Sequence, residues 1–186
     1  MKRRTLVIAG AAGLAAACST PGEGPSDPAA RRRAIDAEVD SALADLYAKT
    51  PSAREMAAKA QGILVFPKVV SAGFIVGGSY GQGALRKGGA TAGYYSVGAG
   101  SAGLLAGAQT KAMYLLFMTQ DALQKFESSN GWTAGADASV AVVDEGAAAR
   151  FDTETARKPV VGYVRSTGGL MANLSLDGTK FNKLVL

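Results

Sequence analysis

The fold is decided by residues 62–81, which read GILVFPKVVSAGFIVGGSYG. Short runs of valine, isoleucine and phenylalanine alternate there with glycine. β-branched and aromatic residues favour strands, whereas frequent glycine disfavours helix interiors. The stretch therefore predicts strands, and the same pattern of short apolar runs continues from Ile63 toward the C-terminus.

Glycine is especially dense in the first part of this region. It occupies, among others, positions 73, 77, 78, 81, 83, 93, 98, 100, 103 and 107. Such spacing suits bends, bulges and close backbone approach in a curling sheet. We therefore expect an α+β fold, with a curved, mostly antiparallel, glycine-rich sheet, helices at the N-terminus and one short internal helix.

Two helices are predicted before the sheet. Asp27 is the cap of the first, which begins at Pro28. Its apolar face has five members at helical spacing: Ile35, Val39, Leu43, Leu46 and Tyr47. The opposite face is expected to carry Arg31, Arg32, Asp36, Asp40 and Asp45. A second helix follows Thr50-Pro51, with a capping pattern from Ser52 to Glu55, and ends near Gln61-Gly62.

Glycine-containing dipeptides mark two turns within the sheet. Gly88-Gly89 predicts a hairpin between residues 79–86 and 90–97, and Asp177-Gly178 predicts another between 170–176 and 179–184. The runs 112–118 and 160–164 are apolar throughout, so we expect strands that are buried on both faces. Residues 120–128 between them predict a short amphipathic helix with Leu123 and Phe126 inward.

The chain begins with a pattern typical of an exported protein. Cations at positions 2–4 precede an apolar run from Leu6 to Ala17, and Cys18, the single cysteine, follows small residues. The run is shorter than the roughly 20 residues that a membrane-spanning helix needs. A single cysteine has no disulfide partner within the chain. Residues 1–17 are therefore predicted to be a cleaved signal peptide.

This pattern resembles a bacterial lipoprotein signal, which implies that Cys18 is acylated and becomes the first residue. The alternative is an ordinary signal peptide with an incidental cysteine. Ser19 after the cysteine favours the outer membrane by resemblance to the enterobacterial sorting pattern, and we expect the domain to face the periplasm. We expect residues 18–26, rich in Pro, Gly and Ser, to be a tether and residues 27–186 to be a single domain.

Charge and composition exclude several functional classes. The net charge of +5 includes the three cations at positions 2–4, so the mature chain has 17 basic against 15 acidic side chains. A nucleic-acid partner is therefore not expected. Histidine is absent, which removes the commonest general base and metal ligand. We expect no enzyme activity, cofactor or metal site; a carboxylate-dependent hydrolase using Asp144 or Glu145 stays as an alternative.

Two glycine motifs are weak matches to known sites. Residues 98–103 fit a dinucleotide fingerprint, but the helix required after it would hold Gly103 and Gly107 in its interior, at about 1 kcal/mol each. Ser101 sits in an approximate G-x-S-x-G pattern, yet that site needs a histidine. We reject both interpretations.

Seven basic residues are candidates for binding an acidic head group. Three lie together near the start of the first helix, and four lie close to turns: Arg31, Arg32, Arg33, Lys68, Arg86, Lys87 and Lys111. Arginine and lysine can hold phosphate beside free backbone amides. The simpler interpretation is a surface helix and solvated turn tips.

Four sequence blocks together resemble the SYLF domain. They are residues 62–68, residues 72–81, residues 106–109 leading into 115–118, and residues 168–172. The resemblance covers roughly Asp36 to the C-terminus and implies a lipid-binding module without catalytic residues. In eukaryotic members it implies an amphipathic basic N-terminal helix, to which Asp27–Ala48 corresponds, with Arg31 to Arg33 as the nearest counterparts.

These observations predict an outer-membrane lipoprotein whose non-catalytic domain binds acidic phospholipid or fatty acyl groups. Its expected partners are anionic membrane lipids, with an envelope protein as a possible second partner. The alternative is a structural envelope protein that docks to another protein and touches lipid only through its anchor.

Overall fold

The computed structural model describes residues 27–73, 76–102, 107–143, 158–166, 169–170 and 175–186. The predicted signal peptide, Cys18, the tether, Asp144 and Glu145 lie outside these residues. The elements are α1 (Pro28–Lys49), α2 (Pro51–Lys59), β1 (Gly62–Gly73), β2 (Val76–Lys87), β3 (Ala90–Ala102), β4 (Gly107–Phe117), α3 (Gln120–Ser128), β5 (Trp132–Thr133), β6 (Val140–Val143), β7 (Val160–Ser166), β8 (Gly169–Leu170) and β9 (Lys180–Leu184).

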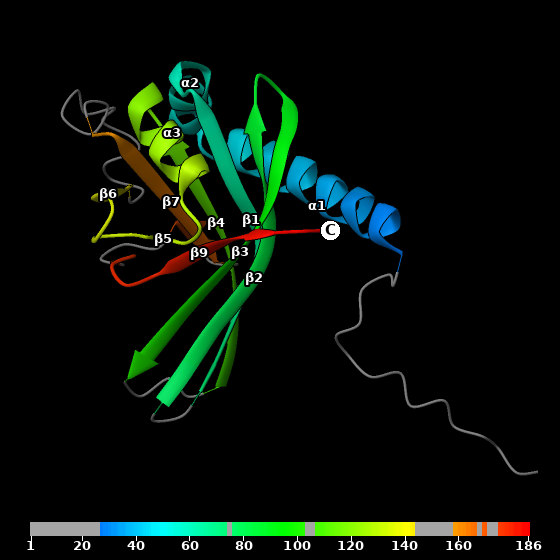
Figure 1. Cartoon of the computed structure of the whole chain (residues 1–186), viewed down its shortest axis with the longest axis vertical. Helices are drawn as coiled ribbons and strands as arrows, with labels where there is room; N and C mark the ends of the chain where they lie inside the picture. The colour runs from blue at the N-terminus through cyan, green and yellow to red at the C-terminus, as the bar shows by residue number, and fades with distance from the viewer. Residues whose placement is uncertain (1–26, 74–75, 103–106, 144–157, 167–168, 171–174) are drawn as a thin grey trace, which may run out of the picture.

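The strands form one sheet in the order β5-β9-β3-β2-β1-β4-β7-β6, with β8 beside β7. The pairing of β6 with β7 is parallel, and the other strand pairs are antiparallel. The distal halves of β1 to β4 curve and extend past the helices (Figure 1). This arrangement confirms the predicted α+β class with a curved, mostly antiparallel sheet.

Helices cover the sheet on both faces, so there are two hydrophobic cores. On one face, α1 and α2 bury Val39, Leu46 and Met56 against Tyr114 and Leu116 of β4. We call this the α1 face. On the other face, which we call the α3 face, aromatic side chains gather around Leu123 of α3: Phe66, Tyr95, Phe117, Phe126, Trp132 and Phe181.

The central strand β4 shows why its sequence is apolar throughout. Met113, Leu115 and Phe117 belong to the core of the α3 face, whereas Tyr114 and Leu116 belong to that of the α1 face. Side chains alternate along a strand, so a strand covered on both sides needs apolar residues at every position. The predicted burial of β4 and β7 on both faces is confirmed.

Helix α1 begins as its sequence predicts. The Asp27 side chain accepts a hydrogen bond from the Ala30 N–H at 2.9 Å, and Pro28 occupies the first turn. The predicted capping pattern at Ser52 is wrong, because Pro51 already occupies the first position of α2 and Thr50 precedes it. The predicted helix from Gln120 to Ser128 is confirmed as α3.

The two predicted hairpins have different outcomes. Gly88 and Gly89, at φ of 56° and 85°, join β2 to β3 as expected. Gly178 also turns the chain at a positive φ of 78°, but β9 then pairs with β3 and β5. Most of the predicted partner strand, residues 171–174, lies outside the described residues, and β9 has β3 and β5 as its partners in the described part of the chain.

A bulge in β1 brings its backbone unusually close to β2. The β1–β2 register shifts between Val65 and Lys68, where β1 has one residue more than β2. A Cβ atom at Gly83 would lie 1.8 Å from the Val65 carbonyl oxygen, and one at Gly81 would lie 2.6 Å from that of Lys68. Backbone atoms on a paired strand cannot move aside cheaply, so glycine is required at both positions.

Replacing Gly83 by alanine should therefore lower the free energy of unfolding by about 3 kcal/mol or more, because the added methyl group overlaps a carbonyl. Denaturant titration measures the change. Gly100→Ala is the matched control, since nothing lies within 4 Å of its Cβ position. The control should change stability by less than about 0.5 kcal/mol. Equal stability of the Gly83→Ala chain and the unaltered chain would contradict the close approach.

Candidate functional site

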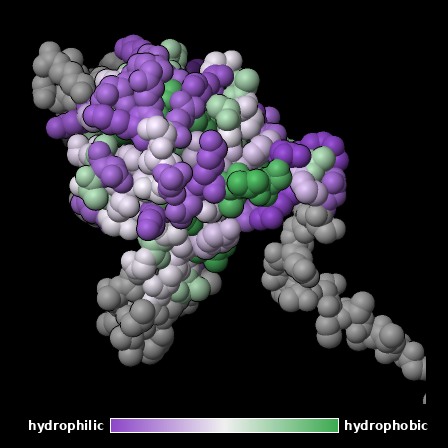
Figure 2. All heavy atoms as spheres, in the orientation of Figure 1, coloured by the Kyte–Doolittle hydropathy of each residue, from purple (hydrophilic) through white to green (hydrophobic). Residues whose placement is uncertain are grey.

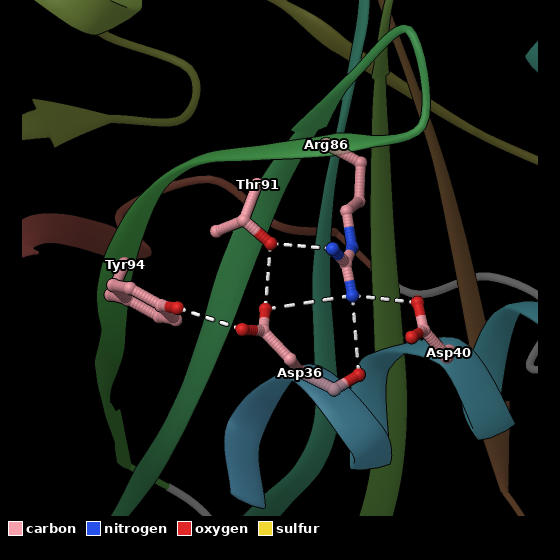
Figure 3. Close-up of polar contacts among 5 residues, drawn as sticks. All are labelled: Asp36, Asp40, Arg86, Thr91 and Tyr94. Carbon is pink, nitrogen blue, oxygen red and sulfur yellow. Dashed lines mark hydrogen bonds and ion pairs between the residues drawn. The ribbon is translucent and has the colours of Figure 1, made fainter. Parts of the chain in front are cut away.

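A cluster of five polar residues fastens α1 to the sheet (Figure 3). We call it the α1 clasp: Asp36, Asp40, Arg86, Thr91 and Tyr94. The Arg86 side chain on β2 is only 11% exposed, and its Nη2 lies 2.6 Å from Asp40 Oδ1 and 3.5 Å from Asp36 Oδ1. From β3, the hydroxyls of Thr91 and Tyr94 donate to the two Asp36 carboxylate oxygens at 2.6 and 2.8 Å.

The clasp satisfies the charges that it removes from water. The Asp36 carboxylate accepts two hydroxyl donors and faces a guanidinium group, which offsets its desolvation. Burial, followed by the hydrogen bond to Asp36, raises the pKa of Tyr94 above its ordinary value. The Tyr94 hydroxyl therefore stays protonated at neutral pH and remains a donor.

This geometry corrects the predicted polar face of α1. Asp36 was expected to point to solvent, but it points to β2 and β3. Successive helix residues are about 100° apart, so Asp36 lies on the flank of the stripe that contains Ile35. Asp40, one turn later, is on the same flank and also reaches Arg86.

A pocket of about 530 Å³ opens beside the clasp, where α1 and α2 meet the turn between β2 and β3. We call it the helix-corner pocket. Its lining comes from both helices, the start of β1 and that turn: Asp40, Leu43, Tyr47, Arg54, Ala57, Ala58, Ala60, Gln61, Gly62, Ile63, Arg86, Gly88 and Gly89. The guanidinium carbon of Arg54 lies 5.8 Å from the centre of the Tyr47 ring. The sequence analysis did not single out Arg54, which lies 32 residues before Arg86.

The three predicted arginines of α1 surround the start of the helix. We call them the arginine ring: Arg31, Arg32 and Arg33. The Arg33 side chain is 74% exposed and 4.0 Å from Asp27, Arg32 donates to the Leu186 backbone oxygen, and Arg31 is half-buried. Because consecutive residues point about 100° apart, they do not share one face of the helix.

The other four predicted basic residues are dispersed. Lys68 pairs with Glu38 of α1 at 3.2 Å, and Arg86 belongs to the clasp. Lys87 instead pairs with Glu127 of α3 at 3.0 Å, on the opposite face of the sheet. Lys111 is half-buried, and its burial lowers its pKa. The structure therefore does not bring the seven residues into one site, and it commits Arg86 to an internal ion-pair network.

Two other kinds of feature, a metal-binding cluster and a membrane-spanning helix, are absent from the described ranges. These ranges contain no cluster of three or more carboxylate, thiol or imidazole side chains that could hold a metal ion. Among the same residues, no helix combines the length and the hydropathy needed to cross a bilayer.

The fold and these features define a small α+β domain with a sheet covered on both faces, a basic helix held to the sheet by ion pairs, and an open pocket with a mainly apolar lining. Residues 98–183 match the Ysc84 family, described as "Las17-binding protein actin regulator". This match confirms the resemblance to the family, also called SYLF, that the sequence shows. No curated protein matches the chain. The matched residues begin within β3, so α1, Arg86 and all the residues that line the helix-corner pocket lie before the matched region.

A domain of this family is consistent with a lipid-binding module. The described structure adds the positions of the charges on it. Figure 2 shows purple, hydrophilic atoms over much of the visible face and strongly hydrophobic atoms where Figure 1 marks the end of the chain. Val185, at this end, is almost fully exposed.

The clasp should contribute strongly to stability. Replacing Arg86 by alanine leaves the half-buried Asp36 carboxylate without its counter-charge, which should cost about 3 kcal/mol in the free energy of unfolding. Lys125→Ala is the matched control, because it breaks an exposed pair with Asp121 and should cost at most about 0.5 kcal/mol. Chemical denaturation of both variants gives the comparison. A loss below about 1 kcal/mol for Arg86→Ala would show that the clasp does not hold α1.

Proposed function

We propose that the protein is an exported lipoprotein, anchored in the outer membrane through Cys18, whose domain binds acidic lipid without catalysing a reaction. One observation carries the lipid-binding part. The clasp turns Asp36 and Asp40 toward Arg86, so these carboxylates do not oppose the arginine ring at the start of α1.

The charge balance around the arginine ring supports attraction to an anionic surface. Glu38, the other acidic residue in this half of α1, pairs with Lys68 of β1. Basic residues near an anionic membrane contribute about 1 kcal/mol each, so three arginines supply at most about 3 kcal/mol, from which the exposed Asp27 beside Arg33 subtracts. This energy is modest alone, and it orients a domain that an anchor already holds at the membrane.

The apolar stripe of α1 is not available for insertion into lipid. Val39 and Leu46 are fully buried against the sheet, and the Tyr114 hydroxyl donates to the Ala42 carbonyl oxygen at 3.0 Å. Removing α1 from the sheet would expose this core. The helix therefore binds head groups with its outer surface while it stays docked.

Two exposed apolar side chains extend the basic region on the same face of the sheet. Val70 and Tyr80 are opposite each other on β1 and β2, and their exposures are 47% and 54%. Val70 lies two residues after Lys68, which reaches α1, so both point to the α1 face. Tyrosine favours the interface between lipid and water, so this pair can contact the bilayer beside the cations.

The length of chain between Cys18 and Asp27 is compatible with this orientation. Eight residues separate them, and an extended chain spans at most about 3.5 Å per residue. The start of α1 and the arginine ring would then remain within about 30 Å of an anchored Cys18. The anchor would hold the protein at the membrane, and the basic region would orient the domain there.

The lipid-binding proposal predicts a specific charge dependence. The test is flotation of residues 19–186 with anionic vesicles. The variant Arg31→Ala/Arg32→Ala/Arg33→Ala should have at least about tenfold lower affinity for these vesicles than the unaltered chain, because it loses three cations. The matched control removes three cations elsewhere: Lys125→Ala/Lys158→Ala/Lys183→Ala. It should bind within about threefold of the unaltered chain. Equal losses in the two triple variants would mean that net charge alone decides binding.

The anchoring proposal has a separate test. In cells, mature protein should carry the mass of acyl chains on Cys18 and should sediment with the outer membrane, because several chains make release very slow. Cys18→Ser should abolish that mass and move the protein out of the membrane fraction. Intact mass spectrometry and fractionation measure both. An unacylated Cys18 in the unaltered protein would refute the anchor and leave the lipid-binding test unaffected.

A further inference from the structure

The helix-corner pocket has the dimensions of a small-ligand site. Its volume of about 530 Å³ falls in the usual range of about 300–1,000 Å³ for such sites. Three separate parts of the chain form it: the α1–α2 corner, the first residues of β1, and the β2–β3 turn. Residues of both helices belong to the core of the α1 face. The packing of these helices on the sheet therefore fixes the shape of the pocket.

Two guanidinium groups, those of Arg86 and Arg54, line the pocket and differ in their ion pairing. Arg86 is largely neutralised by Asp40 and Asp36, yet its buried Nε has no hydrogen-bond partner among the described residues. Arg54 is exposed and has no ion-pair partner in the described part of the chain. Arg86 already faces two carboxylates, so Arg54 is the pocket cation without a carboxylate partner in the described part of the chain, and it is the one that can pair with an incoming anion.

The Tyr47 ring orients the Arg54 guanidinium. The cation lies over the ring at 5.8 Å, a distance at which an aromatic face attracts a cation. Burial raises the pKa of Tyr47, and the charge of Arg54 opposes that rise, as expected for neighbours. An arginine beside an aromatic face keeps its outer N–H groups available to an oxyanion.

The remaining wall is apolar, and the rim is open. Leu43, Ile63 and the alanines of α2 form the wall. At the rim, Gly88 and Gly89 carry no side chains, and nothing lies within 4 Å of either Cβ position. A ligand with an anionic group and an adjoining apolar portion matches both surfaces.

We infer that the helix-corner pocket binds one molecule of an anionic amphiphile, with an oxyanion paired to Arg54 and its apolar portion against Leu43 and Ile63. This inference rests on the proposed lipid-binding function and deepens it. It adds a site for one lipid molecule to a basic surface that would contact many lipid head groups. The oxyanion can belong to a phosphate ester or a carboxylate. Both accept paired hydrogen bonds from arginine.

The test uses residues 19–186, which contain both hydrophobic cores. The probe is dihexanoyl phosphatidic acid below its micelle concentration, followed by ¹H–¹⁵N spectra. The Gly88 and Gly89 amides and the Arg54 side-chain N–H should shift and saturate. Parallel titrations use hexanoate, inorganic phosphate and dihexanoyl phosphatidylcholine. Hexanoate should shift the same signals as phosphatidic acid. Inorganic phosphate should bind more weakly than phosphatidic acid or hexanoate, and phosphatidylcholine should bind most weakly of the four.

Two variants separate charge from shape. Arg54→Ala should weaken binding about tenfold or more, because one charge-assisted pairing is lost. Ala58→Trp adds bulk at an exposed pocket position without changing charge and should also abolish the shifts. Lys125→Ala on α3 is the control and should bind like the unaltered chain.

Several outcomes would overturn this site. They are an absence of saturable shifts at Gly88 and Gly89, equal affinity of the Arg54→Ala chain, equal affinity for phosphatidylcholine, or inorganic phosphate binding as tightly as the amphiphile. Vesicle flotation distinguishes this failure from that of the proposed function. If the pocket fails while the arginine-ring variant still loses vesicle binding, only the single-molecule site is rejected.

Discussion

The sharing of one guanidinium group by two carboxylates is the interaction on which the rest of the structure depends. Arg86 lies on the sheet, and Asp36 and Asp40 lie one turn apart on α1. Because both acids must face β2, the rotation of α1 about its axis is fixed, and its stripe with Val39 and Leu46 falls on the sheet. The same rotation leaves the arginine ring around the free start of the helix and places Asp40 and Arg86 in the wall of the helix-corner pocket.

The sheet beneath α1 is buried on both faces and is curved. Alternate residues of β4 belong to the two hydrophobic cores, so every side chain from Met113 to Phe117 is buried. It is curved because the bulge in β1 forces close approach to β2, which only Gly81 and Gly83 permit. These constraints concern folding, whereas the charged features lie on α1, on α2 and near the ends of β2 and β3 that meet the helices.

Much of the fold could be predicted because its signals are local. The Asp27 cap, Pro28, the Gly88-Gly89 turn and the inward Leu123 of α3 are each decided within a few residues. The signals that were missed are long-range. Asp36 and Arg86 are 50 residues apart, so periodicity placed Asp36 in solvent, and only tertiary structure shows its partner. For the same reason, the pairing of β9 with β3 and the position of Arg54 over Tyr47 could not be derived from the pattern of either segment.

The central claim is that α1 meets an anionic bilayer while it remains fastened to the sheet. Hydrogen–deuterium exchange of the protein, free and bound to anionic vesicles, tests this directly. We predict that the backbone amides of the buried part of α1 and of Tyr114 and Leu116 in β4 exchange equally slowly in both states, while the first turns of α1 gain protection. Faster exchange in β4 on binding would contradict the account, because it would mean that α1 had left the sheet and inserted its apolar stripe.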